Sequence, residues 1–409
     1  MSRKSYGYSS YRSRSYGSYS YGRHRRGNDN KKKIIIVIVC ICVLLAAGAV
    51  GAGVYFGVFG NFTAEPEASQ AQSADTPSKQ ETDTSKQVSE ASKNDQESSA
   101  ASSAPSADLK GEFDGNVFVY DRQGYEIFYG SAGVADKYAQ TVASIKKSLG
   151  KDINVYNLTA PTHSLYGLPE KYQDLGADEK QNIKSIYDSL GSDVKTIDVT
   201  STLEKHKDEY IYFKTDHNWT ALGAYYAYCD FCASAGVKAV DIKTLSEGRI
   251  ENFQGSLIAA TKTDTNKNGN KLLQSNPDTV KYYTMPGNYT CMLLENGKKE
   301  AVEVPLIASF AEGSNAYSAF IWGSNPYMDI KTDLKTGRKL CIITDSYGCA
   351  FAPYTVADFD EIYIVDPRYY SGNIIDYIKK NKYTDVLVIN SVMTANTEIR
   401  TNELKTILK

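Results

Sequence analysis

The chain has 409 residues, of which 42% are hydrophobic, and its formal net charge is −2. This length accommodates one large domain or two small ones, and the near-neutral total indicates neither a strongly basic nor a strongly acidic partner. The charge is unevenly distributed, because bases dominate before residue 34 and acids outnumber bases over residues 61–110. The two ends of the chain are therefore expected to lie in different surroundings.

Residues 1–33 are rich in Ser, Tyr, Gly and Arg and lack the aliphatic residues of a core, which predicts a disordered basic tail. Residues 34–60 carry no charge, and a helix of this length exceeds the roughly 30 Å of a bilayer's hydrocarbon core. We predict a single transmembrane helix there; the alternative is a cleaved signal peptide, whose apolar region is usually about 7–15 residues long. The lysines at 31–33 predict a cytoplasmic N-terminus and an extracellular C-terminal part.

Residues 61–110 are polar and contain few large apolar side chains, which is typical of a flexible linker. A coil of this length has an average span on the order of 40 Å. The sequence therefore predicts a domain tethered to the outer face of the plasma membrane. The exported part keeps only five cysteines, so it has no dense disulfide framework, and we expect a Gram-positive cell envelope.

From residue 111 to 409 the pattern is globular. Short β-branched and aromatic runs predict strands at 116–121, 152–158, 209–214, 340–345, 361–366 and 385–390. Longer stretches between many of them predict helices at 137–149, 178–190, 221–234 and 373–381. This alternation predicts an α/β domain with a mostly parallel sheet and flanking helices. Residues 245–335 interrupt the alternation and are interpreted as a small antiparallel insertion that caps the edge of the site.

No sequence pattern indicates a metal or a cofactor. Cys229 and Cys232 form a single CxxC on an expected helix, which favours small buried side chains over redox or zinc chemistry. Residues 264–270 begin like a calcium loop, but Ser275 stands where the bidentate Glu would be. No phosphate loop and no basic nucleic-acid face is found in the exported part.

One strand-to-helix junction carries a candidate nucleophile. The run 340–345 ends at Asp345, and Ser346, Tyr347 and Gly348 open the next helix. A serine on such a turn projects beside backbone N–H groups, so it combines a nucleophile with part of an oxyanion hole. The alternative is that Asp345 or Ser346 only caps the helix.

A second junction carries a candidate base. A strand is expected to end near Thr215, which leaves Asp216, His217 and Asn218 on the connection before Trp219 and the following helix. His217 is the best-placed histidine, because it lies between a carboxylate and an amide. The other histidines are His24 in the tail, His206 in a charged segment and His163 after a strand. Together the two junctions indicate a Ser/His/Asp site.

These segments resemble the DHHW family, exported relatives of the alginate O-acetyltransferase proteins with an SGNH-hydrolase-like domain. The matching pieces are FKTDHNWTALGAYYAY (213–228), WGSNPY (322–327), ITDSYGCAFAPY (343–354), EIYIVDPRYY (361–370) and TDVLVIN (384–390), with a fainter match at 154–164. They occur in the family's order over about 115–395.

The resemblance implies an acyl-transfer site in which Ser346 is the nucleophile and Asp216 the acid. The chain departs from the family at the base, because Asn218 stands where the alginate acetyltransferase relatives have histidine. His217 is the remaining candidate base. In an extended segment residues 216 and 218 point to one side and 217 to the other, so His217 reaches the nucleophile only if the connection is turned.

The hypothesis is that His217 takes the proton of Ser346 and that Ser346 accepts an acetyl group. Asp216 would orient the imidazole of His217, and Asp345 or His163 are the alternatives for this role. The predicted oxyanion donors are the N–H groups of Tyr347 and Gly348 and the side chain of Asn325. Arg368 and Trp219 suit either a carbohydrate surface or a structural contact.

The leading functional hypothesis is an O-acetyltransferase or acetylesterase that acts on a cell-surface or secreted polysaccharide without a cofactor. A membrane-bound O-acyltransferase is the expected acyl donor. The alternative is a non-catalytic protein that uses the same cleft to bind glycan or to scaffold the modification system.

Overall fold

The computed structural model describes residues 110–409 of the chain. The predicted tail, the predicted transmembrane helix and all but the last residue of the predicted linker lie outside this range. Within residues 110–409, no helix is both long enough and apolar enough to cross a bilayer.

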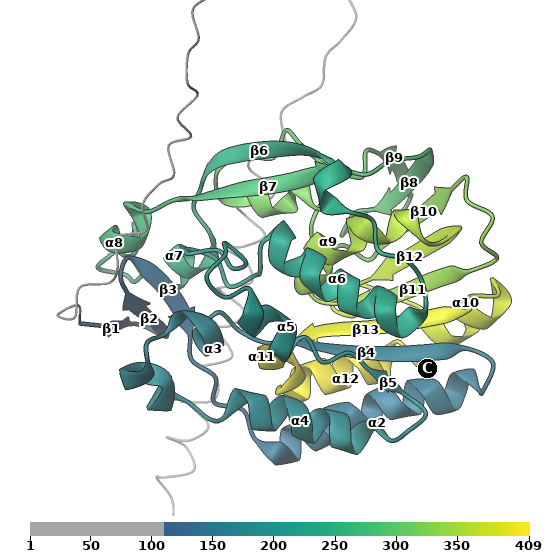
Figure 1. Ribbon diagram of the computed structural model, residues 1–409, viewed down its shortest axis with the longest axis horizontal. Coiled ribbons are helices and arrows are strands. Elements are labelled where there is room, and N and C mark those ends of the chain that lie inside the picture. Colours follow the sequence, from purple (N-terminus) through teal and green to yellow (C-terminus); the bar gives the residue numbers. More distant parts are fainter. Residues whose placement is uncertain (1–109) are drawn as a thin grey trace, which may run out of the picture. The chain divides into compact units, whose positions relative to one another are not determined.

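An eight-stranded sheet forms the centre of the described domain (Figure 1). Its strands, in spatial order, are β5 (Lys195–Thr196), β4 (Asn154–Ala160), β13 (Asp385–Ser391), β11 (Lys339–Thr344), β12 (Glu361–Val365), β10 (Tyr327–Thr332), β8 (Tyr289–Leu294) and β9 (Val302–Val304). The first five are parallel, and the last three are added antiparallel to β12 and to one another. The predicted α/β class is confirmed.

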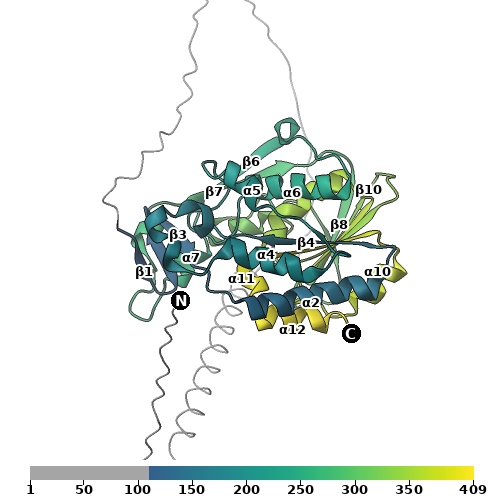
Figure 2. The same ribbon diagram turned by 60° about the horizontal axis from the view of Figure 1, so that its bottom comes forward.

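Helices cover both faces of this sheet because the central strands are apolar on both sides. In β13, Val386 and Val388 pack on one face with the helices α2 (Ala132–Leu149), α4 (Glu179–Leu190), α10 (Ile374–Lys380) and α12 (Glu398–Thr406). Leu387 and Ile389 face the other side, towards α6 (Ala221–Ala235) and α9 (Tyr347–Phe351). Figures 1 and 2 show the two helical layers on either side of the strands. The parallel strands thus bring their carboxyl ends to one edge, where ligand sites form in such sheets.

Smaller elements surround this edge. A separate three-stranded antiparallel sheet is formed by the strands β1 (Glu112–Asp114), β2 (Val117–Tyr120) and β3 (Gln123–Glu126). The strand predicted at 116–121 is β2 of this small sheet and is not part of the main sheet. The short helices are α3 (Ser164–Gly167), α5 (Thr200–Lys205), α7 (Ser256–Ala260), α8 (Lys271–Gln274) and α11 (Val392–Ala395).

The segment predicted as one antiparallel insertion has two parts. β6 (Ser246–Phe253) and β7 (Asp278–Thr284) form a hairpin of their own. β8, β9 and β10 instead continue the main sheet, because their backbone groups pair with β12 and with each other. Only the β6–β7 part is therefore separate from the sheet.

Residues 209–214, expected as a strand, form an irregular segment with one bridge between Tyr212 and Trp219. The reason is that a side chain takes the place of a partner strand: the carboxylate of Asp278 accepts from the backbone N–H of Lys214 at 2.9 Å and of Thr215 at 2.8 Å. The N–H of Phe213 donates back to the carbonyl of Asn218, at 3.3 Å. The chain therefore turns back on itself between residues 213 and 218.

Candidate functional site

The nucleophile turn lies between β11 and α9. Asp345 holds it, since its two carboxylate oxygens accept the N–H groups of Tyr347 at 3.0 Å and of Ser391 at 2.9 Å. Ser346 occupies the cap position of α9, yet its side chain makes no capping hydrogen bond. Asp345 is thus the capping residue, and the half-buried hydroxyl of Ser346 is available for other contacts.

The hydroxyl of Ser346 donates to the side-chain oxygen of Asn218, at 2.9 Å. The amide nitrogen of Asn218 in turn donates to Asp216 Oδ1, at 2.7 Å. Ser346, Asn218 and Asp216 therefore form a continuous chain, with an amide in the middle position. An amide oxygen accepts a hydrogen bond but is not a base, so Asn218 cannot take the proton of Ser346.

His217 approaches the same hydroxyl from the other side. Its Nε2 lies 3.4 Å from Ser346 Oγ, and about a third of its side chain is exposed (32%). The separation is longer than a typical hydrogen bond of this kind, but catalytic contacts in unliganded enzymes often tighten only when substrate binds. The turn at 213–218 thus brings His217 and Asn218 to one serine, which an extended segment would not do.

Ser256, at the start of α7, holds the other side of the His217 ring. Its Oγ lies 2.6 Å from His217 Nδ1, whereas Asp216 Oδ1 is 4.0 Å from the same nitrogen. Gly255 permits this approach, because a Cβ there would lie 2.4 Å from the Cβ of Asp216. The sequence reasoning missed Ser256, whose only signal is a Gly–Ser pair at the opening of a short helix.

Asp216 is buried but remains ionised. Burial opposes its charge, but the charge of His217, the N–H groups of Ser256 and Asn218 and the amide of Asn218 together keep its pKa below the usual range. Glu126, at the end of β3, also lies in the field of this site: burial raises its pKa, His217 lowers it, and Asp216 and Asp345 raise it further.

Trp219 and Tyr347 fix the two junctions to each other. The indole Nε1 of Trp219 donates to the carbonyl of Tyr347 at 2.9 Å, and the Tyr347 hydroxyl donates to the carbonyl of His217 at 2.6 Å. Both side chains are buried, and Trp219 has no exposed surface. Of the two roles considered for Trp219, the structural contact is therefore the one observed.

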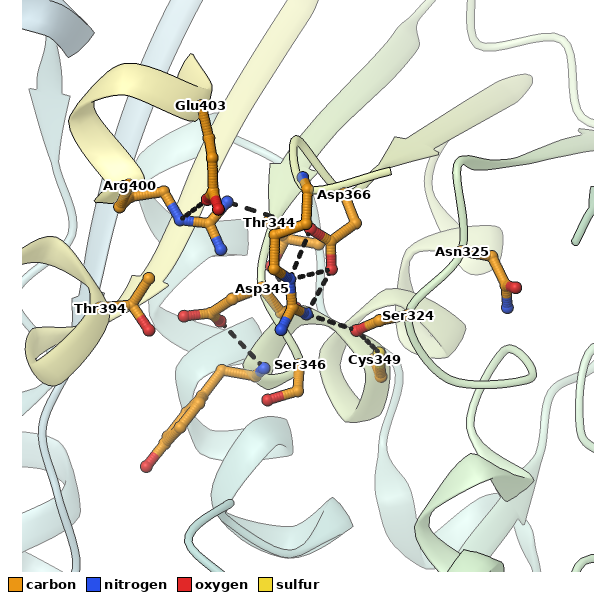
Figure 3. Close-up of polar contacts among 12 residues, drawn as sticks. Ser324, Asn325, Thr344, Asp345, Ser346, Cys349, Asp366, Thr394, Arg400 and Glu403 are labelled. Carbon is orange, nitrogen blue, oxygen red and sulfur yellow. Dashed lines mark hydrogen bonds and ion pairs between the residues drawn. The ribbon is translucent and has the colours of Figure 1, made fainter. Parts of the chain in front are cut away.

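The predicted oxyanion donors are engaged elsewhere. The N–H of Tyr347 donates to Asp345 Oδ1 and that of Gly348 to the Asp345 carbonyl, at 3.2 Å. The amide of Asn325 donates to the carbonyl of Trp322 at 2.9 Å, and Figure 3 shows its side chain apart from Ser346. The N–H of Ser346 itself has no hydrogen-bond partner among the described residues. In this structure it is the free donor next to the nucleophile.

Arg368 forms an ion pair and not an open cationic surface. Its guanidinium group donates to Asp366 through Nε (2.9 Å) and Nη2, and Nη2 also donates to Ser324 Oγ at 2.9 Å. Asp366 follows β12 and lies near the buried Arg400, whose Nε is 3.4 Å from Glu403 (Figure 3). About a third of the Arg368 side chain (35%) remains exposed.

His163, considered as a substitute for Asp216, lies in a different environment. Its ring stacks on Tyr212 with a centroid distance of 5.4 Å and lies 4.6 Å from the ring of Tyr125. Burial lowers its pKa to about 4, so it is neutral at neutral pH. Its contacts are those of a core residue. Among residues 110–409, no cluster of three or more His, Cys, Asp or Glu side chains could hold a metal ion.

Comparison with known protein families identifies the family of the chain. The pattern of the family described as DHHW protein matches residues 56–365, which is more than half of the sequence. The chain belongs to the DHHW family. A DHHW family protein from Eubacterium siraeum DSM 15702, solved at 1.49 Å, is 34% identical; the match covers 72% of this chain and 96% of that one, with a TM-score of 0.67.

More distant structures share the fold of this DHHW protein. Bacillus cereus PatB1, also solved with a sulfonyl adduct, matches with TM-scores of 0.56 and 0.57 at 16% and 15% identity. These matches cover 73% and 71% of this chain and 99% of PatB1. No curated protein sequence matches the chain significantly.

Proposed function

We propose that this DHHW protein is a cell-envelope-anchored serine acyltransferase or acetylesterase that acts on a cell-surface or secreted polysaccharide. The observation that carries the proposal is the 3.4 Å separation between His217 Nε2 and Ser346 Oγ, which puts a base beside a hydroxyl on a strand-to-helix turn. The family's usual histidine position holds Asn218, so His217 is the group that can activate the serine.

In the proposed reaction, the Ser346 proton moves to His217 Nε2 as Oγ attacks the acyl carbonyl. The negative charge that develops on the carbonyl oxygen is stabilised by the N–H of Ser346 and by the imidazolium of His217. Collapse of this intermediate leaves an acetyl ester on Ser346, and His217 returns the proton to the leaving group. A glycan hydroxyl or water then takes the acetyl group by the reverse sequence.

We propose that the domain works outside the cell, held to the plasma membrane through residues 34–60 with the N-terminus in the cytoplasm. A membrane-bound O-acyltransferase would supply the acyl group through the membrane. The linker would keep the domain within on the order of 40 Å of the membrane.

A second candidate is favoured by a specific contact. Because the Ser346 hydroxyl donates to Asn218 Oδ1 at 2.9 Å and not to a base, the site could hold a glycan without turnover. The protein would then act as a binding or scaffolding component of the polysaccharide-modification system.

Hydrolysis of 4-nitrophenyl acetate separates the two candidates. Full-length protein should release 4-nitrophenolate faster than its Ser346→Ala and His217→Ala variants, and mass spectrometry of quenched samples should find one acetyl group on the peptide that carries Ser346. Equal rates for all three proteins, with no acetyl-peptide, would leave the non-catalytic role.

A further inference from the structure

Ser256 stands where the orienting carboxylate of a Ser/His/Asp triad would stand. Its Oγ is 2.6 Å from His217 Nδ1, while the nearest distance from that nitrogen to Asp216 is 4.0 Å. A 4.0 Å separation is too long for a hydrogen bond. The carboxylate of Asp216 already has other partners. Its Oδ1 accepts the backbone N–H and the side-chain amide of Asn218, and its Oδ2 accepts the backbone N–H of Ser256 at 2.8 Å.

Ser256 is held rigidly in this position. The backbone N–H groups on either side of it donate to Thr215, that of Gly255 to Oγ1 at 3.0 Å and that of Leu257 to the carbonyl at 3.0 Å. With the Ser256 N–H on Asp216, three successive N–H groups bind the segment that carries His217. The position of the hydroxyl is therefore determined by the backbone and not by side-chain packing alone.

The position matters because a neutral imidazole carries one proton, on either Nδ1 or Nε2. His217 can accept a proton from Ser346 only if Nε2 is bare, which requires the ring proton to be on Nδ1. That proton needs an acceptor, and Ser256 Oγ is the atom within reach. The negative charge of Asp216 lies nearer to Nδ1 and favours the proton there as well.

We infer that Ser256 is the positioning residue of the site: its hydroxyl accepts the Nδ1–H of His217, fixes the tautomer with a bare Nε2, and replaces the direct carboxylate contact of a Ser/His/Asp triad. This inference rests on the proposed serine chemistry. In the reaction the Ser346 proton moves to Nε2 and later leaves from Nε2, while the Nδ1 proton stays on the ring and continues to donate to Ser256. Asp216 acts on the imidazolium through its charge.

The test compares Ser256→Ala with Ser256→Thr in the full-length protein. Ser256→Ala should lower kcat for 4-nitrophenyl acetate about tenfold or more with little change in KM, because the residue that orients the catalytic histidine is lost. It should also shift the acidic limb of the pH–rate profile to lower pH, because the imidazolium loses an acceptor. Ser256→Thr keeps the hydroxyl and should restore both properties.

A matched control is Ser275→Ala, at an exposed serine whose hydroxyl donates only to the Leu272 carbonyl, and this variant should match wild type. The inference would be overturned if Ser256→Ala kept the wild-type pH–rate profile. It would also be overturned if Ser256→Ala lowered the rate without shifting the acidic limb and Ser256→Thr did not restore the rate.

Nitrogen-15 NMR of the labelled histidine ring tests the tautomer without relying on turnover. Above the pKa of the ring, His217 in wild type should show a protonated Nδ1 and a bare Nε2, and Ser256→Ala should show a mixture of both tautomers. A bare Nδ1 in the wild-type protein would overturn the inference. If instead wild type shows the expected tautomer but is no faster than Ser346→Ala, the assignment to Ser256 stands and the proposed function fails.

Discussion

The side-chain oxygen of Asn218 accepts the hydroxyl hydrogen of Ser346 at 2.9 Å, at the position where a base would receive it. The other end of the amide donates to Asp216, at 2.7 Å. Asn218 therefore makes both hydrogen bonds of a triad histidine and lacks only its basicity.

Replacing Asn218 by histidine should supply that basicity. In Asn218→His, one ring nitrogen can donate to Asp216 and the other can accept from Ser346. We expect kcat/KM for 4-nitrophenyl acetate to rise at least about tenfold, which corresponds to about 1.4 kcal/mol of barrier. The double variant Asn218→His/Ser346→Ala is the control. No increase in the single variant, or an increase that persists in the double variant, would contradict a role for this chain of residues in catalysis.

Gly255 should tolerate no side chain. An added Cβ would lie 2.4 Å from the Cβ of Asp216 and 2.5 Å from the carbonyl oxygen of Thr215. Gly255→Ala is therefore expected to reduce the free energy of unfolding in urea by about 1–3 kcal/mol. Gly133, in α2, has no atom within 4 Å of its added Cβ, so Gly133→Ala should be neutral or slightly stabilising. Equal stabilities of the two variants would be inconsistent with the close approach of α7 to Asp216.

The indole N–H of Trp219 should contribute to both stability and site geometry. Trp219→Phe preserves a buried aromatic ring but leaves the Tyr347 carbonyl without its donor. Loss of this bond should cost about 1–3 kcal/mol in urea unfolding. Tyr317→Phe is a useful comparison, since it removes the hydrogen bond to the neighbouring Ser346 carbonyl at 2.9 Å. If Trp219→Phe unfolds at the wild-type urea concentration, the indole bond does not hold the two junctions together.

Glu179 should make stability depend on pH. It is buried and accepts from both the N–H and the hydroxyl of Thr162, yet burial raises its pKa from 4.5 to about 7. Because the folded pKa is the higher one, the stability gained from this group is complete below pH 4.5 and is lost as pH rises through about 7. This change amounts to about 3 kcal/mol over that window. Glu179→Gln should flatten the difference, measured as urea unfolding at pH 4.5 and 7.5; parallel pH profiles for the two proteins would contradict the shift.

The sequence predicts the strands of the main sheet well where the hydrophobic pattern is strong. β11, β12 and β13 begin and end within one or two residues of the predicted runs, because buried parallel strands have continuous apolar sequences. Residues 209–214 have a similar composition but form no strand. The carboxylate of Asp278, more than 60 residues away, satisfies the backbone there, and no local pattern reveals such a partner.

The site was predictable only in part for the same reason. Ser346 and His217 follow from the two junctions, since each lies beside a recognisable run of apolar residues. The engagement of the Tyr347 N–H depends on which residue caps α9, and the sequence left Asp345 and Ser346 as alternatives. Ser256 is 39 positions from His217 in sequence, and only the fold brings the two together.

The two strands of the hairpin β6–β7 lie next in sequence to two residues that position the turn carrying His217. β6 ends at Phe253, two residues before Gly255 and three before Ser256, and β7 begins with Asp278, which binds the backbone of the His217 turn. Ser346, in contrast, belongs to the central sheet through β11. The base and the nucleophile are thus positioned by different strands, and a shift of about half an ångström between their side chains would bring the 3.4 Å gap into normal hydrogen-bond range.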